Sequence, residues 1–171
     1  MGQWNWPRPS AERYQVMANL VVDTNVFVHS SNPNNAYFSR SIELIDRIKS
    51  SDCVLCLDEG FDSEEASNRS RIWGEYLQFI PEASLARELL SHLLITNRVE
   101  DFSVKVTQNL HNEIKKKVSD PADIVFVKVS YNSQSVHLTS HDFAAFPQEV
   151  RDDFRQKSIS DIVDCLGVTG I

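Results

Sequence analysis

The sequence has no apolar run long enough to cross a membrane, because its longest runs fall far short of the roughly 20 residues that span a bilayer. Its first residues also lack the basic start, the apolar stretch and the small-residue cleavage site of a secretory signal. These two absences argue against a membrane protein and favour a cytoplasmic one.

Cysteine is scarce as well, and the three cysteines do not form a disulfide or metal-binding pattern. Cys53 and Cys56 lie inside CVLCL, which has the composition of a strand, and residues three apart in a strand point to opposite faces. Cys165 is remote in sequence, and no His-x-His or second C-x-x-C completes a metal set. We therefore expect three buried free thiols.

Basic residues are in the minority, with 17 Lys and Arg against 24 Asp and Glu and a formal net charge of −7. Affinity for a nucleic-acid backbone comes from basic patches, so this balance argues against general nucleic-acid binding. Bound metal ions or a local patch can still reverse the sign at one place. The run of lysines at 115–117 is more simply a solvated helix end than a phosphate-binding patch.

Glycine is also rare, with five residues among 171, and no repeat or Gly/Ser linker interrupts the chain. A chain of this length suits one domain. We expect an N-terminal extension at residues 1–18, a single domain at 19–150, and a C-terminal extension at 151–171 that packs on the domain.

Short apolar runs predict strands at residues 19–23, 53–57 and 135–140. Apolar residues at helical spacing predict helices in AYFSRSIELIDRIKSS, in most of 58–80, in PEASLARELLSHLLIT and in 102–117. Strands that alternate with helices of this length indicate a parallel sheet in an α/β fold.

The segment DPADIVFVKVS is ambiguous, because its β-branched residues favour a strand. Its start favours a helix: Asp120 suits the capping position, Pro121 the first turn, and Asp123 the positive end of the helix dipole. We predict a helix.

Acidic residues recur where the predicted strands end. Asp23 follows the first strand, Asp142 follows the last, and Asp123 opens a helix between them. Ligands of open parallel sheets bind beyond the carboxyl ends of the strands. Clustered carboxylates repel each other unless a cation lies among them, and a set of oxygen ligands suits Mg²⁺ or Mn²⁺. Any one of these acids, taken alone, is more simply a helix cap or a turn former.

The ordered set LVVDTNVFVHS, LDEGFDSEEASN, DPADIVFVKVS and VHLTSHDFAAF resembles a PIN domain, over residues 19 to about 150. The resemblance implies a three-layer α/β/α sandwich with a central parallel β-sheet. It also implies a Mg²⁺- or Mn²⁺-dependent endoribonuclease that cleaves single-stranded RNA with a metal-activated water and leaves a 3′-hydroxyl. A homodimer and an inhibitory protein partner are both known among such proteins, and neither follows from this sequence.

By position, the resemblance implies that the catalytic, metal-binding acids are Asp23, Glu64, Asp123 and Asp142. It implies supporting roles, holding loops and ligands in place, for Asn25, Thr139 and Ser140. Glu65 stays open as an alternative to Glu64, because one helical step of about 100° aims the two side chains differently.

Three other functions compete with this one. A haloacid-dehalogenase-like phosphatase needs a second Asp two positions after the first, where this chain has Asn25, and a dinucleotide-binding fold needs glycines that DTNVFV lacks. A PIN-like domain that acts as a protein or RNA interaction module stays open, and the acidic balance favours it slightly. Convergence of Asp23, Glu64, Asp123 and Asp142 on one point would favour the enzyme.

Overall fold

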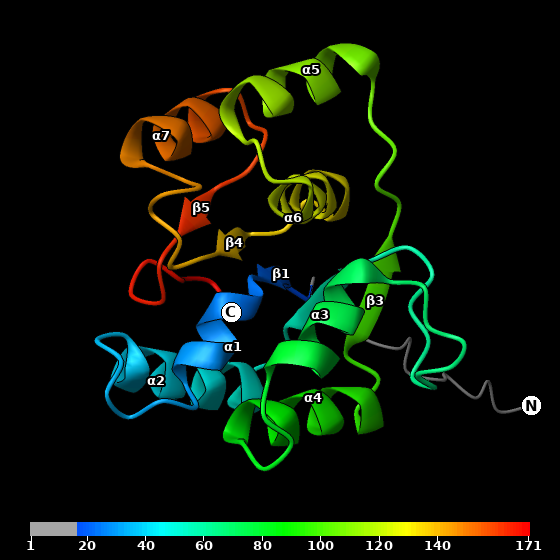
Figure 1. Cartoon of the computed structure of the whole chain (residues 1–171), viewed down its shortest axis with the longest axis vertical. Helices are drawn as coiled ribbons and strands as arrows, with labels where there is room; N and C mark the ends of the chain where they lie inside the picture. The colour runs from blue at the N-terminus through cyan, green and yellow to red at the C-terminus, as the bar shows by residue number, and fades with distance from the viewer. Residues whose placement is uncertain (1–16) are drawn as a thin grey trace, which may run out of the picture.

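Five parallel strands form the centre of the structure, a computed structural model that describes residues 17–171 (Figure 1). The strand order is β3-β2-β1-β4-β5, which places β1 in the middle. The strands are β1 (Asn19–Val22), β2 (Val54–Asp58), β3 (Val99–Phe102), β4 (His137–Thr139) and β5 (Ile162–Val163).

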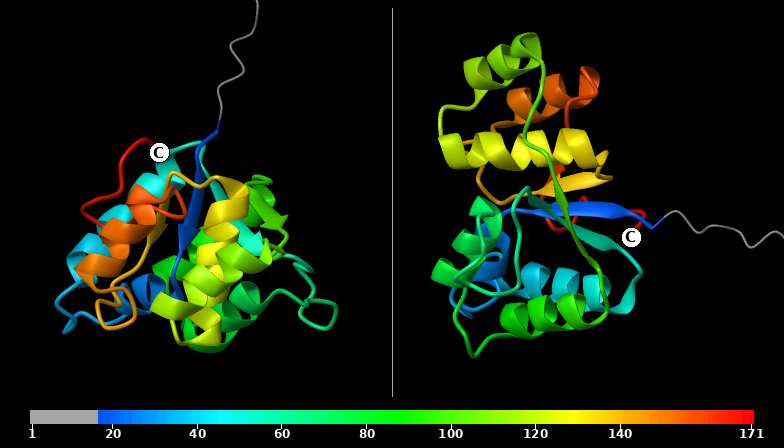
Figure 2. Two further views of the ribbon diagram at one scale, coloured as in Figure 1. Left: turned by 90° about the horizontal axis from the view of Figure 1, so that it is seen from above. Right: turned by 90° about the vertical axis from the view of Figure 1, so that its right-hand side faces the viewer.

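Two layers of helices cover the sheet, with α5, α6 and α7 on one face and α1 to α4 on the other (Figure 2). The helices are α1 (Thr24–His29), α2 (Phe38–Ser50), α3 (Arg71–Phe79), α4 (Leu85–Ile95), α5 (Gln108–Lys117), α6 (Pro121–Ser133) and α7 (Gln148–Gln156). The predicted three-layer α/β/α sandwich with a parallel sheet is confirmed.

The central strands are apolar throughout because helices cover both of their faces. Every residue of β2 is buried, and so are the last three residues of β1. The predicted buried free thiols are confirmed, since Cys53, Cys56 and Cys165 are all buried and unpaired. Within residues 17–171, no helix combines the length and the apolar character that a membrane span requires.

The prediction of a helix for DPADIVFVKVS is confirmed by α6. Asp120 accepts a hydrogen bond from the backbone N–H of Ala122 at 2.7 Å, and Pro121 occupies the first turn. These start signals outweigh the strand propensity of the β-branched residues, which the helix buries against the sheet.

The prediction that most of residues 58–80 is helical is wrong in its first half. The Asp58 carboxylate, at the end of β2, accepts hydrogen bonds from the Ser70 hydroxyl and from the backbone N–H groups of Arg71 and Ile72. These contacts fix the start of α3 at Arg71 and leave residues 59–70 as an irregular loop.

The prediction for residues 102–117 is wrong at its start. Residues Val99–Phe102 form β3, and α5 begins only after Thr107, whose hydroxyl accepts a hydrogen bond from the N–H of Leu110. The every-fourth-residue pattern that begins at Phe102 therefore extends across a strand and a loop before the helix.

The segment after residue 150 is built into the fold. The predicted boundary falls inside α7, and β5 extends the sheet by pairing Ile162 with Leu138 of β4. Phe154 and Val168 of the same segment are buried in the core. Of the expected N-terminal extension, residues 1–16 lie outside the described part of the chain.

Candidate functional site

The candidate site lies where the direction of the chain through the sheet reverses. From β1 the chain continues to β2 and β3 on one side, whereas β4 and β5 lie on the other side. The carboxyl ends of β1 and β4 are neighbours: Val22 pairs with Thr139, and the Asp23 N–H donates to the Thr139 carbonyl at 2.9 Å. Ligands of open α/β sheets bind at such a switch point.

A pocket of about 390 Å³ opens at this point, and five of its lining residues are acids. They come from the end of β1, from α3, from the start of α6 and from the loop after β4. These acids are Asp23, Glu75, Asp120, Asp123 and Asp142.

Asp23 is the most firmly held of the five, and its side chain is only 6% exposed. Its Oδ2 accepts hydrogen bonds from Asn25 Nδ2 at 2.6 Å and from the Ser140 hydroxyl at 2.7 Å. Its Oδ1 accepts from the Asn25 backbone N–H, which caps α1. Burial raises the pKa of Asp23 to about 6, and the charges of Asp142 and Glu75 add to the rise, although the hydrogen bonds oppose it.

The supporting residues join the two strand ends. Besides donating to Asp23, the Asn25 side chain accepts a hydrogen bond from the His141 backbone N–H at 3.1 Å. Ser140 donates to Asp23 and accepts from the Asp142 N–H at 3.0 Å. Thr139 contributes its backbone carbonyl, and its buried hydroxyl oxygen has no hydrogen-bond partner among the described residues.

Asp123 and Asp142 face the same pocket from opposite sides of the reversal. Burial raises the pKa of Asp123 to about 7, and the nearby charges of Asp23, Asp120 and Asp142 contribute to the rise. The Oδ1 atom of Asp142 accepts from the N–H groups of Ala144 and Ala145 at 2.9 and 2.8 Å, which orients the carboxylate.

The structure does not bring Glu64 to this pocket. Glu64 and Glu65 are exposed in the loop that precedes α3, and neither lines the pocket. The prediction of Glu64 as the helix acid is therefore corrected, because the helix begins at Arg71 and the acid that it presents to the pocket is Glu75.

Glu75 is half-buried and belongs to the same charge cluster. Its Oε2 accepts a hydrogen bond from the Thr24 hydroxyl at 3.1 Å, which ties α3 to the start of α1. Burial raises its pKa, whereas the Thr24 hydrogen bond and the charge of Arg71, whose Nε lies 3.6 Å from Oε1, oppose the rise, and the charges of Asp120 and Asp58 add to it. A signal in the sequence could have found it: Ser70 before an apolar periodic run is a helix-start pattern, and its hydroxyl accepts from the Trp73 N–H.

The chemistry of the donor set fits a hard divalent cation, since five carboxylates and the Asn25 amide line the pocket beside a single imidazole, that of His29. The carboxylates lie farther apart than the ligands of an occupied metal site. Within residues 17–171, no three Asp, Glu, His or Cys side chains are grouped closely enough to hold an ion. An ion held here would require rotation of the least constrained carboxylate, that of Asp123.

Three stacked rings, those of His29, Tyr37 and His141, lie beside the pocket, and His29 is the one of them that lines it. The Tyr37 and His141 rings lie 4.3 Å apart, and the His29 and His141 rings lie 5.2 Å apart. The two imidazoles approach through their Nδ1 atoms at 2.9 Å, and His141 Nε2 lies 3.0 Å from Cys165 Sγ. Burial lowers the pKa of His141 to about 4, so this ring is neutral at pH 7. No local pattern in the sequence indicates this stack, because His141 is distant in sequence from His29 and Tyr37.

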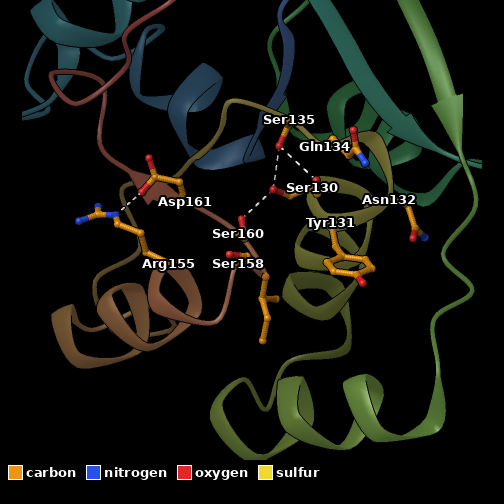
Figure 3. A pocket seen from close by; sticks show the side chains of 10 residues that line it. Ser130, Tyr131, Asn132, Gln134, Ser135, Arg155, Ser158, Ser160 and Asp161 are labelled. Carbon is orange, nitrogen blue, oxygen red and sulfur yellow. Dashed lines mark hydrogen bonds and ion pairs between the residues drawn. The ribbon is translucent and has the colours of Figure 1, made fainter.

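A larger hollow of about 490 Å³ lies between the end of α6 and the segment after α7 (Figure 3). Its polar groups are paired with one another: the Ser130 hydroxyl contacts those of Ser135 and Ser160 at 2.7 Å, and Arg155 contacts Asp161 at 2.5 Å. It therefore lacks the concentration of unneutralised charge that distinguishes the acid pocket.

No protein-family model matches the chain, and no curated protein matches it either. The evidence on function is therefore the pocket and its chemistry.

Proposed function

We propose that the chain is a PIN-like, metal-dependent endoribonuclease that cleaves single-stranded RNA at the acid pocket. The observation that carries the proposal is the gathering of acids from four separate elements at the switch point of a parallel sheet. We assign Asp23, Glu75, Asp123 and Asp142 as the residues that hold Mg²⁺ or Mn²⁺.

The cluster costs the metal-free protein stability, which is why a cation is the natural complement. Burial and mutual repulsion raise the pKa values of Asp23 and Asp123 to about 6 and about 7. The net charge of −7 would also repel RNA unless it were neutralised locally. A bound Mg²⁺ or Mn²⁺ supplies Lewis-acid polarisation of a phosphodiester and lowers the pKa of water.

The residues around the cluster have distinct tasks in this proposal. Asn25 and Ser140 hold the Asp23 carboxylate in one orientation through Oδ2. Thr24 holds Glu75 through Oε2. The backbone of the loop after β4 holds Asp142 through Oδ1, so three of the four acids are oriented before a substrate arrives.

The second candidate is an interaction module on the same fold that binds protein or RNA without cleaving it. The observation in its favour is the lack of a preformed three-ligand group within residues 17–171.

A comparison of two Glu→Gln variants separates these functions. Wild type, Glu75→Gln and the matched control Glu64→Gln are each incubated with mixed single-stranded RNA in Mn²⁺, Mg²⁺ or EDTA. We expect metal-dependent cleavage by wild type and by Glu64→Gln, and a loss of at least about 100-fold in Glu75→Gln, the scale reported for loss of one strong electrostatic contact. Equal activity of the two variants would exclude Glu75 from the site, and no cleavage by wild type would favour the interaction module.

A further inference from the structure

The acid pocket has a second, apolar wall that the metal chemistry does not use. Val28 of α1, Phe79 of α3 and Ala122 of α6 line the pocket together with the acids. Phe79 is 54% exposed, which makes it the most exposed aromatic residue in the described part of the chain.

Within α3 and directly after it, Phe79 is the one aromatic residue that is mostly exposed. The other aromatic residues of α3, Trp73 and Tyr76, are 3% and 0% exposed, and Ile80 directly after the helix is 2% exposed. The helix therefore buries its other aromatic residues, and Phe79 is its one apolar residue that lines the pocket.

The position of Phe79 relative to the acids follows from helix geometry. It comes four residues after Glu75, so both side chains lie on the same face of α3, about 6 Å apart along the axis. A phosphodiester held beside Glu75 would carry its sugar and base within reach of the ring.

We infer that Phe79 stacks on an unpaired nucleobase adjacent to the phosphodiester held at the acid pocket, which makes the pocket selective for single strands. This inference rests on the proposed nuclease function. Aromatic rings bind the faces of all four bases, whereas a base inside a duplex already has both faces stacked on neighbours. A nucleotide therefore matches the two walls, with the phosphate at the acids and the base at the ring.

A protein partner fits this surface less well. Among the described residues that line the pocket, Phe79 is the one large apolar side chain that is classed as exposed. A stable protein interface needs a buried area many times larger than a single ring, whereas a base needs one flat face.

The test is a double-mutant cycle between the ring and the base. Binding of a short fluorescent single-stranded RNA is measured by anisotropy in Ca²⁺ in place of Mg²⁺, which suppresses cleavage and leaves the acids of the pocket intact. The protein variants are Phe79→Ala, Phe79→Tyr and, as the control, Tyr131→Ala, which removes an aromatic ring that is 42% exposed and lines the other hollow. The RNA is used with its bases, with abasic sites in their place, and as a duplex.

We expect Phe79→Ala to weaken binding of the ordinary RNA by about 5- to 140-fold, the equivalent of one lost base stack. It should not change binding of the abasic RNA or of the duplex, while Phe79→Tyr and Tyr131→Ala retain wild-type affinity. The ring is mostly exposed, so the alanine variant should fold normally, and its circular dichroism and melting temperature verify this.

Equal weakening on ordinary and abasic RNA, or none on either, would overturn the stacking role. The cleavage assay of the unmutated protein separates this failure from failure of the proposed function. If wild type cleaves RNA but the cycle shows no coupling between Phe79 and the base, the stacking inference fails alone. If the cycle shows coupling but wild type does not cleave RNA, the nuclease function fails alone. If the protein neither binds nor cleaves RNA, both fail.

Discussion

The raised pKa of Asp23 makes the stability of the metal-free protein depend on pH. The side chain has a pKa of about 6 in the folded protein against an ordinary value of 3.8, so the folded state binds more protons than the unfolded state between these values. Stability therefore falls as the pH rises from about 4 through about 6. Asp123 acts in the same direction up to about pH 7.

Asp23→Asn should remove part of this dependence. At pH 7.5 in EDTA, we expect the variant to be as stable as wild type or more stable, by up to about 3 kcal/mol, because a pKa shift of about two units disappears and only the weak Oδ1 cap is lost. Urea denaturation at several pH values measures this change in stability. In a separate assay without urea, the variant should not cleave RNA at any of these pH values. A melting temperature many degrees below that of wild type at pH 7.5 would show that Asp23 has a structural role instead.

The same pKa values predict that cations and protons compete for the pocket. Because Asp23 and Asp123 take up protons below about pH 6 and about pH 7, Mn²⁺ should bind more tightly at pH 8 than at pH 6 and should release protons as it binds. Calorimetric titration in two buffers of different ionisation enthalpy measures both effects. Glu64→Gln should behave as wild type and Glu75→Gln should bind weakly; an affinity independent of pH would count against these carboxylates as ligands.

At the scale of elements, the junction between β2 and α3 depends on one carboxylate. Asp58 is 6% exposed and accepts from the Ser70 hydroxyl and from the N–H groups of Arg71 and Ile72. Removing it leaves buried donors without partners at the start of the helix that presents Glu75.

Asp58→Ala should therefore lower the free energy of unfolding by about 2–4 kcal/mol, as loss of a cap and of buried hydrogen bonds implies. The neighbouring exposed Glu59 is the matched control, and Glu59→Ala should change stability by less than about 0.5 kcal/mol. Urea midpoints at equal m-values measure the two changes. Similar values for both variants would mean that the junction does not depend on the Asp58 contacts.

The elements show what local sequence can and cannot predict. The start of α6 was predictable because Asp120 and Pro121 act through contacts a few residues away. Strand β3 was missed because its middle residues, Glu100 and Asp101, are exposed and carry no strand pattern. The prediction placed the start of this helix too early and therefore assigned Glu64 as its acid, whereas the structure places Glu75 of α3 at the pocket.

At the scale of the whole molecule, the site depends on contacts between residues far apart in sequence. The gathering of Asp23, Asp123 and Asp142 at one pocket was predictable because each stands at a strand end or helix start, and parallel topology brings such positions to one edge. Nothing local links Asn25 to His141 or Thr24 to Glu75, so these contacts emerged only from the packing of α1 against α3 and of β1 against β4.

The C-terminal segment, predicted as an extension at residues 151–171 that packs on the domain, contributes buried residues to the core of the whole molecule. Its residues include Phe154, which is fully buried between α7 and the sheet, and Ile162 of β5, which is 1% exposed. A core that extends past residue 150 should unfold together with the rest of the molecule in one transition.

Phe154→Ala should accordingly destabilise the whole protein by about 3–5 kcal/mol, the usual cost of truncating a buried aromatic ring. The control is Leu166→Ala in the same segment, whose side chain is 58% exposed and whose loss should cost less than about 1 kcal/mol. Both are measured by urea denaturation, followed by tryptophan fluorescence, which includes Trp73 on the other side of the sheet, and by circular dichroism. The two signals should shift together in Phe154→Ala. If circular dichroism reports an early transition that the fluorescence does not, the segment after residue 150 is an appendage that unfolds separately, and the predicted boundary has physical meaning after all.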